Sequence, residues 1–390
     1  MRVSTRASAR TQLPFVFPER YLNYYPLDSV EIPSGADAQP PADMPAMAWW
    51  RFAETRAYPD IARLNIDGLP HAPLPNETIQ QLRRAYYATV TYIDDECGRV
   101  LDALQTHNLA SNTIVLFWGD HGFALGEHGL WDKNTNFAIA THVPTILRVP
   151  GMTDSGTRTR SLSSTVDFLP TLADLALGVT LPRCGEDSAE VQLCAEGVSL
   201  RPLLTRPNVP VKLATFSVEW RGLPKKKAKK KGAALRASHA GEADYADSIL
   251  QLDGDADILA RSDYDEGDDA MRIDGKPRLR PMRLLTSASE SGPVDPPSSC
   301  LTTGCVMGYS MLTLVKGVEL RYTEWVKYEQ VNGTWQPDWQ QTFGKELYNH
   351  TEDPAENANI YRHGGSSLLG TLRDRLRRGW RSAFLKDAVA

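Results

Sequence analysis

The chain has 390 residues and is 42% hydrophobic, which is enough to bury a sizeable core and excludes a wholly disordered chain. Its 43 Lys and Arg against 48 Asp and Glu give a formal net charge of −5, which excludes a globally basic surface for nucleic acid. The longest strongly apolar stretch, residues 113–118, is far shorter than the roughly 20 residues that cross a bilayer, so no membrane span is expected.

At the amino terminus, residues 1–10 are basic and rich in Ser, and no apolar segment follows them. A secretory signal peptide needs such a segment, so we expect none in this chain. Residues 19–75 are rich in Pro, Asp and Ala without periodic apolar runs, and they predict irregular chain.

The next part of the chain shows regular apolar patterns. The pattern changes at Glu77, and helical spacing of apolar residues from Leu82 to Leu104 predicts an amphipathic helix of about 28 residues in all. The β-branched and aromatic run from Thr113 to Trp118 predicts a strand buried on both faces, and residues 145–149 predict a second strand. A helix is expected at residues 166–177. Helix, strand, polar loop, strand and helix is the order of an α/β domain.

Charge blocks interrupt this order. Residues 225–231 contain six lysines, and residues 241–270 hold eleven acids against one Arg. Such blocks repel themselves and lack apolar spacing, so we expect residues 221–298 to form a disordered insertion.

Regular alternation returns after the charge blocks. Residues 309–315 and 319–325 predict an antiparallel hairpin with Lys316-Gly317 in the turn, and residues 371–383 predict a basic helix. We therefore expect two units: residues 1–207, and a smaller α+β unit at 208–390 that the insertion interrupts.

The five cysteines are too few for a disulfide scaffold. Two close pairs, Cys184 with Cys194 and Cys300 with Cys305, suggest local disulfides instead.

The polar loop at residues 119–129 follows the first predicted strand, where ligand sites of open α/β sheets lie. Asp120 and His121 can offer an oxygen and a nitrogen to a divalent cation, and the neighbouring glycines permit close backbone approach. Alternatively, Asp120 caps a turn and His121 is a hydrogen-bonded core residue. Lys133 is either an anion-binding charge or a solvated lysine, and His142 is either functional or structural.

Residues 118–133 resemble the second half of the sulfatase signature, in the alkaline-phosphatase-like superfamily. Further segments carry the resemblance over most of the chain outside the charged blocks: residues 13–15, 84–94, 140–144, 149–151, 164–172, 182–184, 346–348 and 353–354. The resemblance implies the carboxyl-terminal part of a sulfatase. The implied fold is α/β: a partial mixed or parallel sheet with flanking helices, plus a smaller carboxyl-terminal α+β subdomain.

The resemblance also implies a calcium-dependent sulfate-ester hydrolase acting on a sulfated sugar or glycosaminoglycan, with a 2-O-sulfate favoured. Asp120 and His121 would bind Ca²⁺, Lys133 would neutralise the sulfate and the leaving oxygen, and His142 would support substrate binding. A lysosomal or secreted location is implied.

The resemblance does not include the nucleophile of the family. Sulfatases attack with a formylglycine made in a Cys/Ser-x-Pro-Ser-Arg motif, and the 390 residues contain no such motif. Two other functions therefore stay open: a non-catalytic sulfatase-like binding protein, and another metal-dependent hydrolase of phosphate or phosphonate esters.

Overall fold

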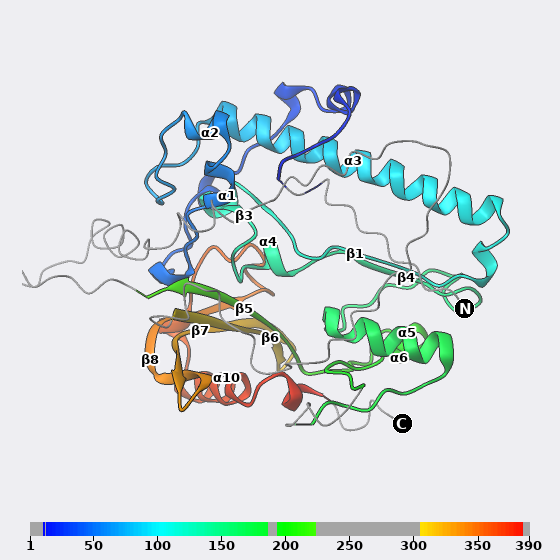
Figure 1. Cartoon of the computed structure of the whole chain (residues 1–390). Coiled ribbons are helices and arrows are strands. Elements are labelled where there is room, and N and C mark those ends of the chain that lie inside the picture. The colour runs from blue at the N-terminus through cyan, green and yellow to red at the C-terminus, as the bar shows by residue number, and fades with distance from the viewer. Residues whose placement is uncertain (1–10, 12, 186–192, 224–304, 385–390) are drawn as a thin grey trace, which may run out of the picture.

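A computed structural model describes residues 11, 13–185, 193–223 and 305–384 (Figure 1). Within these ranges the chain builds a long helix, a two-stranded sheet with loops beside it, and a four-stranded sheet. The predicted insertion lies outside the described ranges from residue 224 onward, and so does Cys300. No helix in the described ranges combines the length and the apolarity that a bilayer crossing needs.

The amino-terminal part is irregular, as predicted, with 3-10 turns and two short helices, α1 (Ala53–Arg56) and α2 (Pro59–Ala62). It packs against α3 (Asn76–Thr106), the long helix that the apolar spacing predicts. The Tyr21 hydroxyl donates a hydrogen bond to Asp95 Oδ2 at 2.7 Å, which holds the first turns of the chain against α3. Figure 1 shows α3 extending along one side of the molecule, above the two-stranded sheet.

The two-stranded sheet pairs β1 (Val115–Trp118) with β4 (Thr145–Arg148). Both strands were expected, but the prediction that the first is buried on both faces is wrong. Phe117 and Trp118 are each 41% exposed. Among the described strands β1 pairs with β4 alone, and two strands cannot cover both faces of their own sheet.

The connection between β1 and β4, which pair antiparallel, lies wholly within the described residues and contains no long helix that could cross over the sheet. It contains a small hairpin of β2 (Ala124–Leu125) and β3 (Trp131–Asp132), then α4 (Ala138–Thr141). A crossover between parallel strands takes a dozen or more residues, usually a helix that packs on the sheet, and α4 has only four residues. The sequence predicts a mixed or parallel sheet, whereas the three sheets of the described residues are antiparallel.

The helix predicted after β4 is α5 (Phe168–Leu177). A capping box precedes it, in which Ser164 and Asp167 each bond the other's backbone. Lys212 Nζ lies 2.6 Å from Asp167 Oδ2, and both side chains are buried. This ion pair joins α5 to the segment that follows the short α6 (Arg201–Thr205).

The four-stranded sheet has the order β5 (Ala214–Gly222), β6 (Cys305–Val315), β7 (Val318–Val331) and β8 (Thr334–Asn349). The predicted hairpin is confirmed, because β6 pairs with β7 around the turn at Lys316-Gly317. Both turn residues adopt positive φ, which matches the right-handed twist of the strands.

The basic helix predicted at residues 371–383 is α10 (Ser366–Arg378), which begins earlier and ends earlier than expected. It stops where Gly379 adopts a φ of 72°. Leu372 and Leu376 are buried against one face of the four-stranded sheet. In Figure 1 α10 lies below this sheet, whereas α1 and α4 lie above it.

A second hydrophobic cluster covers the opposite face of the four-stranded sheet. There Val306, Trp325 and Tyr348 pack with Trp49 and Phe137 from the amino-terminal half. The predicted boundary between the two units, after residue 207, stays a prediction. This core contains residues from both sides of that boundary.

The predicted start of the insertion at residue 221 is wrong. Strand β5 continues to Gly222, and Arg221 is only 5% exposed. Its guanidinium donates hydrogen bonds to the carbonyls of Trp49 at 3.1 Å and Asn134 at 2.8 Å. In the sequence, Arg221 stands just before the lysine block and is therefore predicted to belong to the charged segment. The residues that bind its guanidinium are distant in the sequence, so the local pattern does not reveal them.

The exposed face of the β1–β4 sheet predicts self-association. Phe117 lies opposite Ile146, and these side chains are 41% and 62% exposed. An Ile146→Lys substitution places a charge on this face, so we expect weaker concentration-dependent association in light scattering. Leu314→Lys, an exposed position on β6, is the control for the added charge. Equal association of the wild type and the Ile146 variant would contradict the prediction.

Candidate functional site

The loop after β1 lies close against α4. Gly119 N–H donates to the Pro144 carbonyl at 3.2 Å, and Gly122 N–H donates to the Ala140 carbonyl at 2.8 Å. A Cβ on Gly122 would lie 1.9 Å from the Ile139 carbonyl oxygen, so this contact requires glycine. The position of the loop therefore depends on the position of α4.

Asp120 and His121 lie in this loop next to each other. The Asp120 carboxylate accepts the His121 N–H at 3.0 Å, and its other oxygen is 3.7 Å from His121 Nε2. His121 Nδ1 is 2.7 Å from the Gly122 carbonyl. The Asp120 side chain is 77% exposed and that of His121 29% exposed, so the aspartate is accessible and the histidine is half-buried.

These two residues supply an oxygen and a nitrogen donor, which is only part of a calcium site. Ca²⁺ takes six to eight oxygen ligands. Within the described ranges no cluster of three or more His, Cys, Asp or Glu side chains is placed to hold a metal ion. The described residues alone therefore do not fit a complete site for this ion.

Lys133 follows strand β3 and forms an ion pair instead of being fully solvated. Its Nζ lies 2.9 Å from Oε2 of Glu54 in α1, and both side chains are half-buried. The cation is thus held by an acidic neighbour that the sequence did not single out. An incoming anion would share Lys133 with Glu54.

The residue before Lys133 anchors this part of the site. Asp132 is fully buried with a φ of 69°, and its carboxylate accepts hydrogen bonds from the Thr55 hydroxyl and from Trp50 Nε1 at 3.3 Å. Burial raises the pKa of Asp132 to about 6, although the hydrogen bond from Thr55 opposes the shift. Asp132 therefore joins β3 to α1, the helix that carries Glu54.

His142 ends α4, where its N–H donates to the Ala138 carbonyl at 2.8 Å. The side chain is exposed. Asp120, His121 and His142 are thus placed by one short helix, whereas the ion pair of Lys133 depends on α1.

Sequence reasoning missed three residues that shape this region. Arg83 on α3 pairs with Glu127 at 2.8 Å, and Glu127 also accepts the Leu125 N–H at 2.6 Å. Glu356 accepts the Ala138 N–H at 2.7 Å and so holds the first residue of α4. Arg83 falls on the polar side of the predicted helix, which gives no sign of a partner. Glu356 lies two residues after the matched segment 353–354, and this proximity is the one signal that could have found it.

Of the four cysteines predicted to pair, Cys184 and Cys194 form a disulfide in the structure. Cys305 is buried at the start of β6, and Cys300 lies outside the described residues, so that pair stays a prediction.

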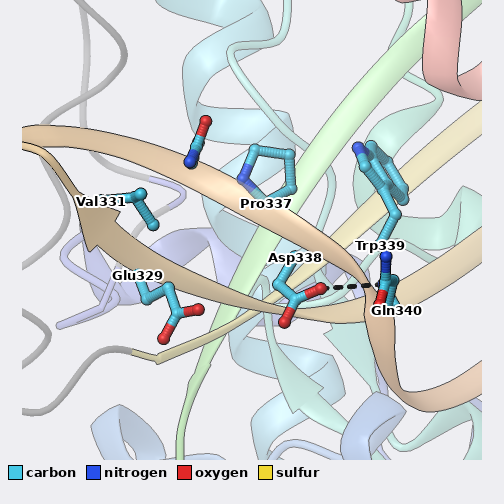
Figure 2. Close-up of a pocket in the computed structure, with 7 residues that line it drawn as sticks. Glu329, Val331, Pro337, Asp338, Trp339 and Gln340 are labelled. Carbon is cyan, nitrogen blue, oxygen red and sulfur yellow. Dashed lines mark hydrogen bonds between the residues drawn. The ribbon is translucent and has the colours of Figure 1, made fainter.

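A hollow of about 320 Å³ lies at the end of the β7–β8 hairpin (Figure 2). It is lined by Glu329, Val331, Gln336, Pro337, Asp338, Trp339 and Gln340. The Asp338 carboxylate accepts the Gln340 N–H at 2.9 Å, as Figure 2 shows. None of the site residues predicted from the sequence lines this hollow.

Comparisons with known proteins identify relatives of this chain. Residues 14–179 match the sulfatase family. The iduronate 2-sulfatase of Mus musculus is 29% identical over 392 residues, covering 93% of this chain and 58% of the relative. That of Homo sapiens is 36% identical over 215 residues, covering 49% of this chain and 38% of the relative. This chain therefore spans only part of the length of the relatives it matches.

One solved structure supports the fold. The phosphonate monoester hydrolase of Agrobacterium radiobacter has a TM-score of 0.50 and 18% identity, covering 95% of this chain and 55% of that chain. At this identity the likeness concerns the fold alone. It agrees with the partial sulfatase fold expected from the sequence.

The close contact at Gly122 predicts a destabilising effect of Gly122→Ala. The added Cβ would clash with the Ile139 carbonyl, so we expect the free energy of unfolding to fall by about 1–3 kcal/mol in urea denaturation. Gly98→Ala is the control, because Gly98 lies in α3 with open space around it. That change should stabilise the chain by about 0.5–1 kcal/mol. A neutral Gly122→Ala would show that the loop does not depend on α4.

The buried Asp132 predicts a pH dependence of stability. Its pKa is about 6 in the folded chain against an ordinary 3.8, so the folded state binds more protons between these values. The free energy of unfolding contributed by this group therefore falls as pH rises from about 4 to 6, by on the order of 3 kcal/mol. Asp132→Asn should flatten the curve measured by urea unfolding across this range. A variant curve parallel to the wild type would contradict the assignment.

Proposed function

Because residues 14–179 belong to the sulfatase family, we propose that this chain serves the hydrolysis of sulfate esters of sugars. The family match carries the proposal, since it includes the loop at residues 119–133 and His142. Two relatives bear the name iduronate 2-sulfatase, which favours a glycosaminoglycan 2-O-sulfate as the substrate class.

Lys133 binds the sulfate group in this proposal. Its ammonium group is accessible enough to meet an anion and is held in place by Glu54 at 2.9 Å. A fixed cation beside the sulfate stabilises the negative charge that develops on the leaving oxygen during hydrolysis. Glu54 holds the lysine in this position when no substrate is present.

Asp120 and His121 contribute two ligands to a cation site, for which Ca²⁺ is the ion we propose. A bound cation would supply positive charge near the sulfate oxygens. Asp120 suits this role because its carboxylate is mostly exposed, and its hydrogen bond from the His121 N–H orients it. His142, exposed at the end of α4, supports substrate binding.

The proposal assigns no nucleophile to this chain. The Cys/Ser-x-Pro-Ser-Arg motif does not occur in its 390 residues. Asp120, His121, Lys133 and His142 thus hold the cation and the sulfate, and turnover requires a nucleophile that this sequence does not contain.

A lysosomal or secreted location belongs to the same proposal. The disulfide between Cys184 and Cys194 supports it, because such bonds persist in oxidising compartments.

Binding of a sulfated sugar tests the role of Lys133. We expect the full chain, with Ca²⁺ present, to bind a 2-O-sulfated uronate disaccharide in titration calorimetry. Lys133→Ala should weaken this affinity about tenfold or more, because it removes a charge-assisted contact. Lys133→Arg should retain most of the affinity, and Lys316→Ala, in the exposed β6–β7 turn, is the matched control. Equal affinities of wild type and Lys133→Ala would refute the role.

Two further assays separate the other functions. Because this sequence contains no formylglycine motif, we expect the chain alone to bind the disaccharide without releasing sulfate. Release of sulfate would exclude a non-catalytic sulfatase-like protein and would show that another group serves as the nucleophile. Faster turnover of an aryl phosphonate ester than of an aryl sulfate would favour a phosphonate hydrolase and contradict the proposed substrate class.

A further inference from the structure

Glu356 is a buried carboxylate that is not among the residues proposed to bind sulfate or the cation. It follows β8, adopts a φ of 61° and is 1% exposed. One of its oxygens, Oε1, accepts a hydrogen bond from Arg321 Nε. The same oxygen lies 2.7 Å from His350 Nε2. The other accepts the backbone N–H of Ala138 at 2.7 Å. The carboxylate thus connects the four-stranded sheet to the first residue of α4.

The charge of Glu356 is secured by its surroundings. Burial alone would raise its pKa, but Arg321 and His350 outweigh burial and lower the pKa to about 2. Arg321 itself packs on two rings, 4.8 Å from the centroid of Phe137 and 4.5 Å from that of Tyr348. The acceptor that holds Ala138 is therefore a charged and rigidly placed group.

From Ala138 the connection reaches the loop in one further step. Helix α4 has only four residues, so an anchor at its first residue constrains all of it. The Ala140 carbonyl receives the Gly122 N–H at 2.8 Å, and the Ala138 carbonyl receives the His142 N–H at the same distance. Gly122 directly follows Asp120 and His121.

We propose that Glu356 is a positioning residue for the loop that carries Asp120 and His121, acting through the Ala138 N–H and helix α4. This role rests on the proposed function, because that function makes the loop part of a site. The alternative is that Glu356 only stabilises the fold as a whole.

A second buried carboxylate offers a matched control. Glu324 is fully buried in β7, accepts the Tyr322 hydroxyl at 2.6 Å and pairs with Arg377 at 2.8 Å. Its partner Arg377 belongs to α10, on the sheet face away from α4. Glu324→Gln therefore removes a comparable buried charge without touching the connection to the loop.

Ala138→Pro breaks the same hydrogen bond without removing the charge of Glu356. Ala138 is the first helical residue, where proline is tolerated, and the preceding Phe137 has φ −63° and ψ 150°, which suits a residue before proline. The substitution removes the N–H that donates to Glu356 and places the proline ring against Oε2, so the carboxylate keeps its charge but must shift away from α4. It keeps the test possible if Glu356→Gln does not fold.

Hydrogen exchange of the full chain, followed by mass spectrometry, tests the proposal. We expect residues 119–124 and 138–143 to exchange about tenfold faster in Glu356→Gln and Ala138→Pro than in the wild type. In Ala138→Pro, exchange in β6 and β7 should rise less than in Glu356→Gln, because Arg321 and His350 keep a charged partner. Glu324→Gln should speed exchange in β7 and α10 and leave the loop at the wild-type rate.

Two outcomes would overturn the proposal: a folded Ala138→Pro chain with wild-type exchange in the loop, or loop exchange raised equally by Glu324→Gln. The exchange readout needs no substrate. Failure of the proposed function would appear separately, as absence of binding to the sulfated disaccharide in the wild type. If that binding occurs, Glu356→Gln should weaken it and Glu324→Gln should not.

Discussion

Burial of Arg321 between the two halves of the described chain is the constraint on which much of the remaining structure depends. Its guanidinium bonds Glu356, lies 3.7 Å from Glu346 and contacts the ring of Phe137. Moving a charge out of water costs several kcal/mol unless partners compensate it, so these groups must stay together once the core closes. Burial raises the pKa of Glu346, and the positive charge of Arg321 opposes this rise. The sheet thereby holds the segment that leads into α4.

The loop of the candidate site is supported unequally on its two sides. On the α4 side, hydrogen bonds and buried charge fix the backbone. On the β1 side, the loop continues from a two-stranded sheet whose Phe117 and Trp118 are partly exposed. A strand with few buried contacts opens more readily than one inside a core. The loop therefore depends more on α4 and its anchors than on the strand that leads into it.

Backbone conformation adds a second constraint near the site. His128 and Asp132 both adopt positive φ, at 57° and 69°, within the β2–β3 hairpin. Such conformations cost free energy and persist only where surrounding contacts enforce them. For Asp132 those contacts are the hydrogen bonds from Thr55 and Trp50, and they place Lys133 beside Glu54.

The sequence alone determined the local elements and the family resemblance of this protein. Apolar spacing predicted α3 and α5, strand alternation and turn chemistry predicted the β6–β7 hairpin, and the motif around Asp120 identified the loop. These signals are local, because they depend on helical period, strand period and residues close together in the chain.

Tertiary structure alone decided which distant groups meet. Lys133 with Glu54, Arg221 with the Trp49 carbonyl and Glu356 with the Ala138 N–H are pairs separated by 79, 172 and 218 residues. No periodicity reports such pairs, since each depends on how the halves of the chain close over a shared core. The exposure of Phe117 was missed for the same reason: apolar character predicts burial, but only the neighbouring strands determine whether a face is covered.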